Sequence, residues 1–283
     1  MNAINKHLHL FRAVVILSAI VAVPLAWGAE TVGNGDRVVV PLSDPARPAF
    51  VKAHLLQGSI TVKGGTANNI VVEARVRDTE HEGSEGGMHR IPVNTTGLQV
   101  EEENNKVDIG ADSTQRTVDL TITVPTRTSL SLHTVNDGDI NVSNVDGELD
   151  VNDVNGSVTL KGVSGTVVAH ALNGKVLVTL NRINPSKPMA FSSLNGDIDV
   201  TFPPDLKANL VISSDHGEVL SDFDVALQAR APEQIKEDTR NSGGSYHVKI
   251  DKTVHGTING GGQEIQFRNF NGNIYIRKAG AKG

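Results

Sequence analysis

Five glycines spaced nine residues apart constrain the fold of this 283-residue chain more than any other feature. Each begins a short stretch in which apolar and polar residues alternate, as in Gly138-Asp-Ile-Asn-Val142. Successive residues of a strand point to opposite faces, so the second and fourth residues after each glycine are expected to be buried. Glycine allows the backbone to turn without a Cβ clash. Each step therefore predicts one half-buried strand and one corner. The five glycines are Gly138, Gly147, Gly156, Gly165 and Gly174.

A unit that repeats without change stacks on copies of itself. We therefore expect an all-β fold: an elongated, β-helix-like β-solenoid of short strands with about 9-residue half-coil steps. Two nonapeptides, or three, would form one coil, and successive coils would pair as parallel strands. The nine-residue calcium-binding repeat of β-rolls is excluded because its second and third glycines and its fixed aspartate are missing.

Further steps of this kind occur outside the regular ladder. They begin at Gly196, Gly217, Gly256 and Gly272, and residues 36 to 76 contain a first, imperfect one at Gly58. Four steps of the regular ladder also carry an apolar residue two places before the glycine: Val145, Val154, Val163 and Leu172.

Two segments interrupt the pattern. Residues 78–92 are rich in glycine and charge and are expected to be a solvated loop. Their potential metal ligands (His81, Glu82, Glu85 and His89) match no ligand spacing. Residues 224–245 contain helix formers and then Asn241-Ser-Gly-Gly-Ser245, which leaves a short helix, another ordered excursion or a mobile loop open. Residues 98–102 and 106–109 flank Asn104-Asn105, which predicts a hairpin.

The N-terminus resembles an export signal. Lys6 and Arg12 precede the apolar run Ala13–Val23, and cleavage is expected after Gly28 or Ala29. The run is about 11 residues long, whereas a membrane span needs about 20, so a retained anchor is the less favoured alternative. We therefore expect a signal peptide at 1–29, a single solenoid domain at 30–283, no transmembrane segment in the mature chain, and a periplasmic, secreted or cell-surface location.

Composition excludes several classes of partner and chemistry. The chain has no cysteine, so neither a disulfide nor a lipidated cysteine is expected. Loss of the signal would move the formal net charge from −6 to −8, which argues against nucleic-acid binding. With seven Phe, two Tyr and one Trp, the chain has few aromatic platforms for sugars or bases.

The sequence contains only weak patterns of candidate catalytic residues. Parallel β-helices can carry paired carboxylates for acid/base chemistry, and the acids that begin or continue the glycine steps are expected to face outward. They form a possible ligand face, although no arginine or lysine cluster accompanies them. The histidines (His133, His170, His216 and His255) are scattered, and we predict no catalytic, cofactor-binding or metal-binding residue. The acids of the possible ligand face are Asp139, Glu148, Asp150, Asp197 and Asp199.

Three stretches, 54–76, 135–200 and Gly256–Arg277, resemble a bacterial domain family of unknown function that is labelled "putative adhesin". The resemblance implies an exported or envelope-associated β-solenoid with Asn-Gly-Asp-Ile steps and no established catalytic residues. It covers most of the mature chain.

Three hypotheses follow from the sequence. The favoured one is a non-catalytic exported envelope or surface protein, an adhesin-like scaffold that binds an envelope protein or a polysaccharide. The second is a carbohydrate-active parallel β-helix enzyme acting on an acidic polysaccharide. The third is a self-assembling structural solenoid, since an uncapped end presents unpaired strands. The sequence predicts neither the ligand nor the oligomeric state.

Overall fold

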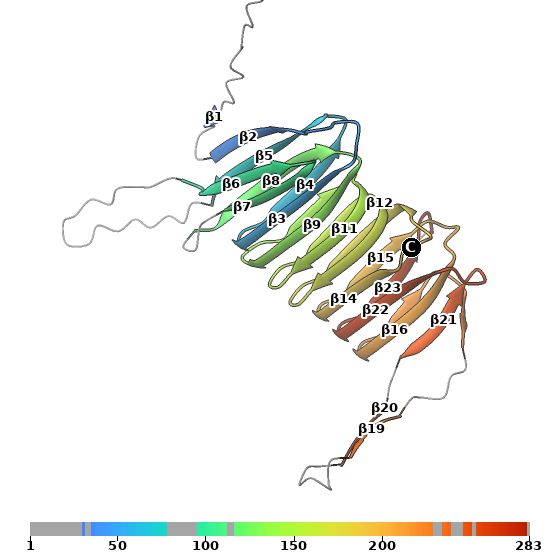
Figure 1. Ribbon diagram of the computed structural model, residues 1–283. Coiled ribbons are helices and arrows are strands. Elements are labelled where there is room, and N and C mark those ends of the chain that lie inside the picture. The colour runs from blue at the N-terminus through green and yellow to red at the C-terminus, as the bar shows by residue number, and fades with distance from the viewer. Residues whose placement is uncertain are drawn as a thin grey trace, which may run out of the picture.

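The computed structural model describes residues 30–31, 35–77, 95–111, 116–228, 234–238, 246–250 and 253–281. The expected signal peptide and the expected loop at 78–92 lie outside these residues. The described residues form strands and turns and contain no helix, so the all-β prediction is confirmed. Figure 1 shows the strands as a stack that runs from β2 to β21.

The stack has two walls, here called sheet 1 and sheet 2, which β12 joins by running through the corner between them. Sheet 1 contains, in spatial order, β2 (Gly35–Pro41), β5 (Asn69–Val76), β8 (Val118–Pro125), β4 (Ile60–Gly65), β10 (Ile140–Ser143), the first half of β12 (Val158–Ala171), β13 (Val176–Ile183), β15 (Ile198–Phe202), β23 (Ile274–Lys278) and β17 (Val219–Ser221).

In its central, parallel part, sheet 2 has as many strands as sheet 1. It contains, in spatial order, β6 (Leu98–Glu103), β7 (Lys106–Ala111), β3 (Ala49–Gln57), β9 (Thr128–Asn136), β11 (Asp146–Asp153), the second half of β12, β14 (Met189–Asn195), β22 (Gln263–Asn271), β16 (Ala208–His216), β21 (Val254–Ile258) and β18 (Val225–Leu227). Outside this frame, β1 (Glu30–Thr31) pairs with β2, and β19 (Gln234–Asp238) pairs with β20 (Tyr246–Ile250).

Two nonapeptide steps form one coil. Successive steps alternate between the sheets, so residues 18 apart stack in parallel register: Ile140 lies beside Val158, and Leu149 lies beside Val167. This settles the number of steps per coil at two. The repeat of nine in the sequence is therefore a repeat of about 18 in the molecule.

The spatial order departs from chain order at the last coil. Strands β22 and β23 lie between the coil of β14 and β15 and the coil of β16 and β17, and they are hydrogen-bonded on both sides. The strands that end the chain are therefore interior rungs of the stack (Figure 1).

Antiparallel strands flank both ends of sheet 2 and one end of sheet 1, whereas the other end of sheet 1 is the parallel strand β17. The expected hairpin is confirmed as β6 and β7, with Asn104 and Asn105 at φ 53° and 67°, the two positive values that a tight type I′ turn requires. At the other end, β21 and β18 pair antiparallel beyond β16. Where residues 224–245 are described, they form strands rather than the helix that was one of the options.

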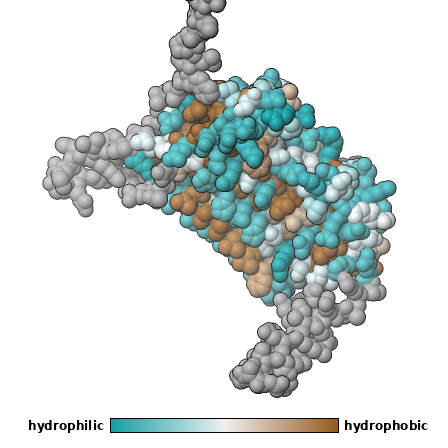
Figure 2. Space-filling view, viewed as in Figure 1, coloured by the Kyte–Doolittle hydropathy of each residue, from teal (hydrophilic) through white to brown (hydrophobic). Residues whose placement is uncertain are grey.

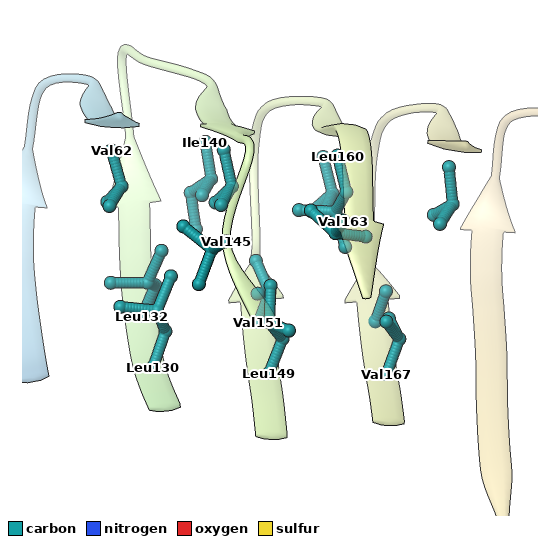
Figure 3. Close-up of a cluster of buried hydrophobic side chains, with 14 of the residues drawn as sticks. Val62, Leu130, Leu132, Ile140, Val145, Leu149, Val151, Leu160, Val163 and Val167 are labelled. Atoms are coloured by element: carbon teal, nitrogen blue, oxygen red, sulfur yellow. The ribbon is translucent and has the colours of Figure 1, made fainter. Parts of the chain in front are cut away.

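The core between the sheets is aliphatic. Inward residues of sheet 1, such as Val62, Ile140 and Leu160, face those of sheet 2, such as Leu132 and Val151 (Figure 3). Towards the C-terminal end three phenylalanines fill the same space, and the rings of Phe191 and Phe267 stack at 5.4 Å while Phe202 meets both edge-on.

Glycines line one of the two corners in an unbroken column. A Cβ on Gly156 would lie 2.0 Å from the carbonyl oxygen of Gly138, and one on Gly174 would lie 2.0 Å from that of Gly156. Adjacent rungs can approach only because the side chain is missing. In order, the column is Gly58, Gly138, Gly156, Gly174, Gly196, Gly272 and Gly217.

The other expected turn glycines lie elsewhere. Gly147 and Gly165 contact each other at the opposite corner, where a Cβ on Gly165 would lie 2.1 Å from the carbonyl oxygen of Gly147. Gly256 does not lie at a turn: it is inside β21, paired antiparallel with Leu210 and Leu227. Its sequence resembles a ladder step, but the strand that contains it runs antiparallel to both of its neighbours.

We expect Gly156→Ala to lower the free energy of unfolding by about 1–3 kcal/mol, because the added methyl group must push two backbone rungs apart. Gly65→Ala is the matched control, since no heavy atom lies within 4 Å of the place where its Cβ would stand. Urea unfolding monitored by circular dichroism measures both. Equal effects of the two substitutions would contradict the close-contact interpretation.

Candidate functional site: an apolar row on the outer face of sheet 2

The five acids of the expected ligand face do not share a face. Asp139, Asp197 and Asp199 belong to the sheet 1 side, whereas Glu148 and Asp150 belong to the sheet 2 side. The five acids are exposed or half-buried, as expected of outward positions, but the prediction that they share one register is wrong, because neighbouring nine-residue steps lie on opposite walls. Asp139 and Asp197 share the glycine corner but are three rungs apart, about 14 Å at the usual strand spacing.

At the glycine corner these carboxylates hold neighbouring rungs together. The backbone N–H of Ser157 donates to Asp139 Oδ1 at 2.8 Å, and that of Asn273 donates to Asp197 Oδ1 at 3.0 Å. The side-chain oxygens of Ser59 and Asn273 likewise accept from backbone N–H groups of the next rung, those of Asp139 and Glu218. The residue after most of the corner glycines is therefore a structural acceptor, whereas Lys175, which follows Gly174, has no side-chain acceptor.

Three of the acids also have cationic neighbours. Both oxygens of Asp199 accept from Arg277 Nε, at 2.8 and 2.9 Å. Glu148 is bonded to Lys187, and Asp197 lies 3.8 Å from Lys175 Nζ. Asp197 directly precedes β15 and Asp199 lies within it, yet each is engaged by a neighbouring rung. This arrangement gives no support to a pair of carboxylates free for acid/base work.

A hollow of about 380 Å³ lies at the second corner beside Gly147 and Glu148. Two arginines and two acids line it, and Arg182 donates to Asp146 at 2.6 Å. Since its charges are of both signs and partly paired, the hollow has no clear preference for an anion or a cation. Among the described residues, no group of three or more His, Asp or Glu could hold a metal ion.

The feature that stands out is a row of apolar side chains on the outer face of sheet 2. Outward residues of these strands are otherwise mostly polar, but the last outward residue on six consecutive rungs is apolar. Leu56 is 53% exposed, Phe270 42% and Leu194 39%, and the other three are half-buried. The register places them side by side: Leu56, Val135, Val154, Leu172, Leu194 and Phe270.

At the usual rung spacing the apolar row is about 24 Å long. Figure 2 shows brown patches along the lower edge of the molecule, beside a largely teal face. On the next rung the matching residue is Asp215 of β16, which ends the row.

A ladder of asparagines borders the apolar row on the side of the glycine corner. Asn155 Nδ2 donates to Asn136 Oδ1 at 2.7 Å, Asn173 to Asn155 at 2.9 Å, Asn195 to Asn173 at 2.8 Å, and Asn271 to Asn195 at 2.9 Å. Each amide is thus fixed in orientation by the next. His216 on β16 lies in register with Asn271 and continues the line.

A second polar row borders the apolar row on the other side. It begins with His54 and His133 on neighbouring rungs and continues through Asn152, His170 and Ser192. His170 Nδ1 and Ser192 Oγ share a hydrogen bond of 2.7 Å, and burial lowers the pKa of His170, which favours the neutral ring at neutral pH. This border therefore adds hydrogen-bonding groups, and on the rung of β22 it continues with the charged Arg268, which lies in register with Ser192.

Two further histidines lie apart from this row: His216 extends the asparagine ladder and His255 lies in β21. The apolar row itself was not predicted. The sequence feature that could have predicted it is the apolar residue two places before a glycine. Residues with this feature, however, lie in two different environments. Val145 and Val163 are buried at the second corner, whereas Val154 and Leu172 face outward.

Residues 119–259 match the family model described as Toastrack DUF4097. This confirms the resemblance to the adhesin-labelled domain family of unknown function. No curated protein matches the chain.

Solved structures that are similar to the chain include two bacterial proteins. One is described as a "putative cell adhesion protein" from Clostridium sporogenes ATCC 15579, at 9% identity and TM-score 0.40, covering 86% of this chain and 99% of that one. The other is described as a "putative adhesin" from Bacteroides fragilis NCTC 9343, at 14% identity and TM-score 0.35, covering 86% of this chain and 96% of that one. Similarity at this level is too low to carry functional information.

We expect Asn173→Ala to lower the free energy of unfolding by about 1 kcal/mol, because Asn173 both donates to and accepts from neighbouring amides. Asn141→Ala, on the exposed outer face of sheet 1, is the control and should change stability by less than about 0.5 kcal/mol. Thermal and urea unfolding of both variants would reveal the difference. A neutral Asn173→Ala would mean that the ladder has no energetic role.

Proposed function

Because the chain carries a Toastrack domain of unknown function over residues 119–259, we propose that it is a non-catalytic, exported envelope or surface protein that binds a partner through the apolar row. In this proposal residues 1–29 are removed on export and 30–283 form a single domain. No helix within the described residues is long and apolar enough to cross a membrane.

The observation that carries the proposal is the apolar row itself. An exposed leucine or phenylalanine adds nothing to the stability of a monomer. An apolar strip with polar borders is typical of an interaction surface. The strip stands on hydrogen-bonded parallel strands with the asparagine ladder along its edge, so its shape is set before a partner arrives. A preformed surface loses less conformational entropy on binding.

The chemistry of the apolar row favours a protein partner. Five of its six side chains are Leu or Val, which pack well against aliphatic protein surface, whereas sugars are usually bound on aromatic rings. Phe270 at one end is the single aromatic in the row. A partner with its own narrow apolar strip and hydrogen-bonding margins would fit the row and both polar borders.

The two alternatives have less support. The enzyme hypothesis needs carboxylates that converge on a substrate. The five acids proposed from the sequence are instead divided between two walls, and four of them are held by neighbouring groups: Asp139, Glu148, Asp197 and Asp199. Self-assembly through the ends is opposed at one end of sheet 1 by the antiparallel strands β2 and β5, and at one end of sheet 2 by β18 and β21. The other end of sheet 1 has less protection, because the described residues pair β17 with β23 alone.

The test is cross-linking in the envelope of the cells that make the protein. A photoreactive residue at position 194 should cross-link a protein, and Leu172→Asp should reduce the yield about tenfold, since loss of one well-packed contact costs about 1–2 kcal/mol. Leu177→Asp is the matched control: Leu177 is 40% exposed but lies on sheet 1. It should leave the yield unchanged.

Other outcomes discriminate between the hypotheses. Cross-links only to a second copy of the chain would favour the self-assembling solenoid. Equal loss with Leu172→Asp and Leu177→Asp would show that the apolar row is not the binding surface. Binding of a polysaccharide, with turnover that disappears in Asp139→Asn or Asp150→Asn, would establish the enzyme instead.

A further inference from the structure

One carboxyl group in the core has no partner. Asp153 ends β11, and its side chain points inward next to the glycine corner. It is 0% exposed, and neither of its carboxyl oxygens has a hydrogen-bond partner. A buried ionised carboxylate without a partner is strongly unfavourable, so this group needs a physical explanation.

The neighbouring rungs supply one. Three buried residues at the same position donate to the carbonyl of a corner glycine on the preceding rung. Thr134 Oγ1 donates to Gly58 at 2.9 Å, Ser193 Oγ to Gly174 at 2.9 Å, and Asn269 Nδ2 to Gly196 at 3.0 Å.

On the rung of Asp153 the corresponding acceptor is the carbonyl of Gly138. A Cβ on Gly156 would lie 2.0 Å from that carbonyl oxygen and 2.7 Å from Asp153 Oδ2, so both oxygens border the same small space. An ionised carboxylate can only accept hydrogen bonds, and it would place its charge against another acceptor. A neutral carboxylic acid has an O–H to donate.

We propose that Asp153 is held in the folded protein as a neutral carboxylic acid that donates to the Gly138 carbonyl, which makes the stability of the stack depend on pH. The proposal is independent of the binding function of the apolar row. The pair Asp139 and Asp153 is not an acid/base pair for catalysis, because the enclosed carboxyl group of Asp153 cannot reach a substrate.

The surroundings of Asp153 agree with a retained proton. Burial, and secondarily the negative charge of Asp139, raise the pKa of Asp153 from 3.8 to about 7. The backbone N–H groups of Asn155 and Ile140 act in the opposite direction, but they donate to the carbonyls of Val135 and Ser157.

No opposite charge stands beside Asp153 on the adjoining strands. The flanking residues are Thr134 on β9 and Ala171 on β12, which do not titrate in this range. Asp139, at the start of the β10 rung, is therefore the charged group that acts on it.

The direction of the pH effect follows from the two pKa values. Below about pH 4 the carboxyl group is protonated in both folded and unfolded chains, and it adds no pH dependence. Between about pH 4 and pH 7 the folded chain keeps a proton that the unfolded chain releases, so stability falls as pH rises. This contribution to the folding equilibrium constant falls about tenfold per pH unit. Above about pH 7 it levels off.

Asp153→Asn tests the proposal. Asparagine does not titrate and can donate to the Gly138 carbonyl as Asn269 does to Gly196. Relative to the unmodified chain, the variant should gain about tenfold in folding equilibrium constant for each pH unit from 4.5 to 6.5, measured by urea unfolding. Asp150→Asn is the control, since Asp150 lies on the same strand but is exposed. Its difference from the unmodified chain should not change with pH.

A direct measurement decides the case even if Asp153→Asn fails to fold. The Asp153 carboxyl carbon, followed by NMR in the unmodified chain, should titrate near pH 7, well above the ordinary aspartate value of 3.8. Asp153→Ser, which copies Ser193, should remove the same pH dependence of stability. An Asp153 carboxyl group that is ionised at pH 5, or a stability difference that is constant from pH 4.5 to 6.5, would overturn the proposal.

Discussion

The contact of bare backbone with bare backbone at the glycine corner governs the rest of this structure. Parallel strands pair at about 4.8 Å, and at the corner the chain must keep that spacing while it turns. A Cβ at Gly138, Gly156 or Gly174 would overlap the rung beneath, so the corner closes only where side chains are missing. The geometry of the corner fixes how adjacent rungs align. This alignment places the asparagines of the ladder and the corner acceptors beside their partners on the next rung.

The corner also explains how far the sequence could predict the molecule. The glycine spacing, the alternation after Gly138 and the paired asparagines at 104 and 105 correctly predicted an all-β solenoid, its inward residues and the β6–β7 hairpin. These features depend on local backbone geometry and on the period of two. They can therefore be read from short stretches of sequence.

The candidate site could not be predicted in the same way, because it depends on which wall each step joins. Asp139 and Glu148 have the same place in their steps, yet they lie at opposite corners. Val154 and Val163 likewise precede a glycine by two residues, and one faces outward while the other is buried. The insertion of β22 between β14 and β16 completes the apolar row with Phe270, and no local pattern foretells that pairing.

The position of the last coil has a consequence for how the molecule is built. Strands β22 and β23 follow β14 to β17 in the chain, yet they separate the coil of β14 and β15 from the coil of β16 and β17. A growing polypeptide that has not reached Gln263 cannot bring β14 and β16 into their final places. This solenoid therefore cannot assemble from one end by adding rungs in the order of synthesis. A chain truncated before β22 would lose rungs from the interior of the stack and not from its end.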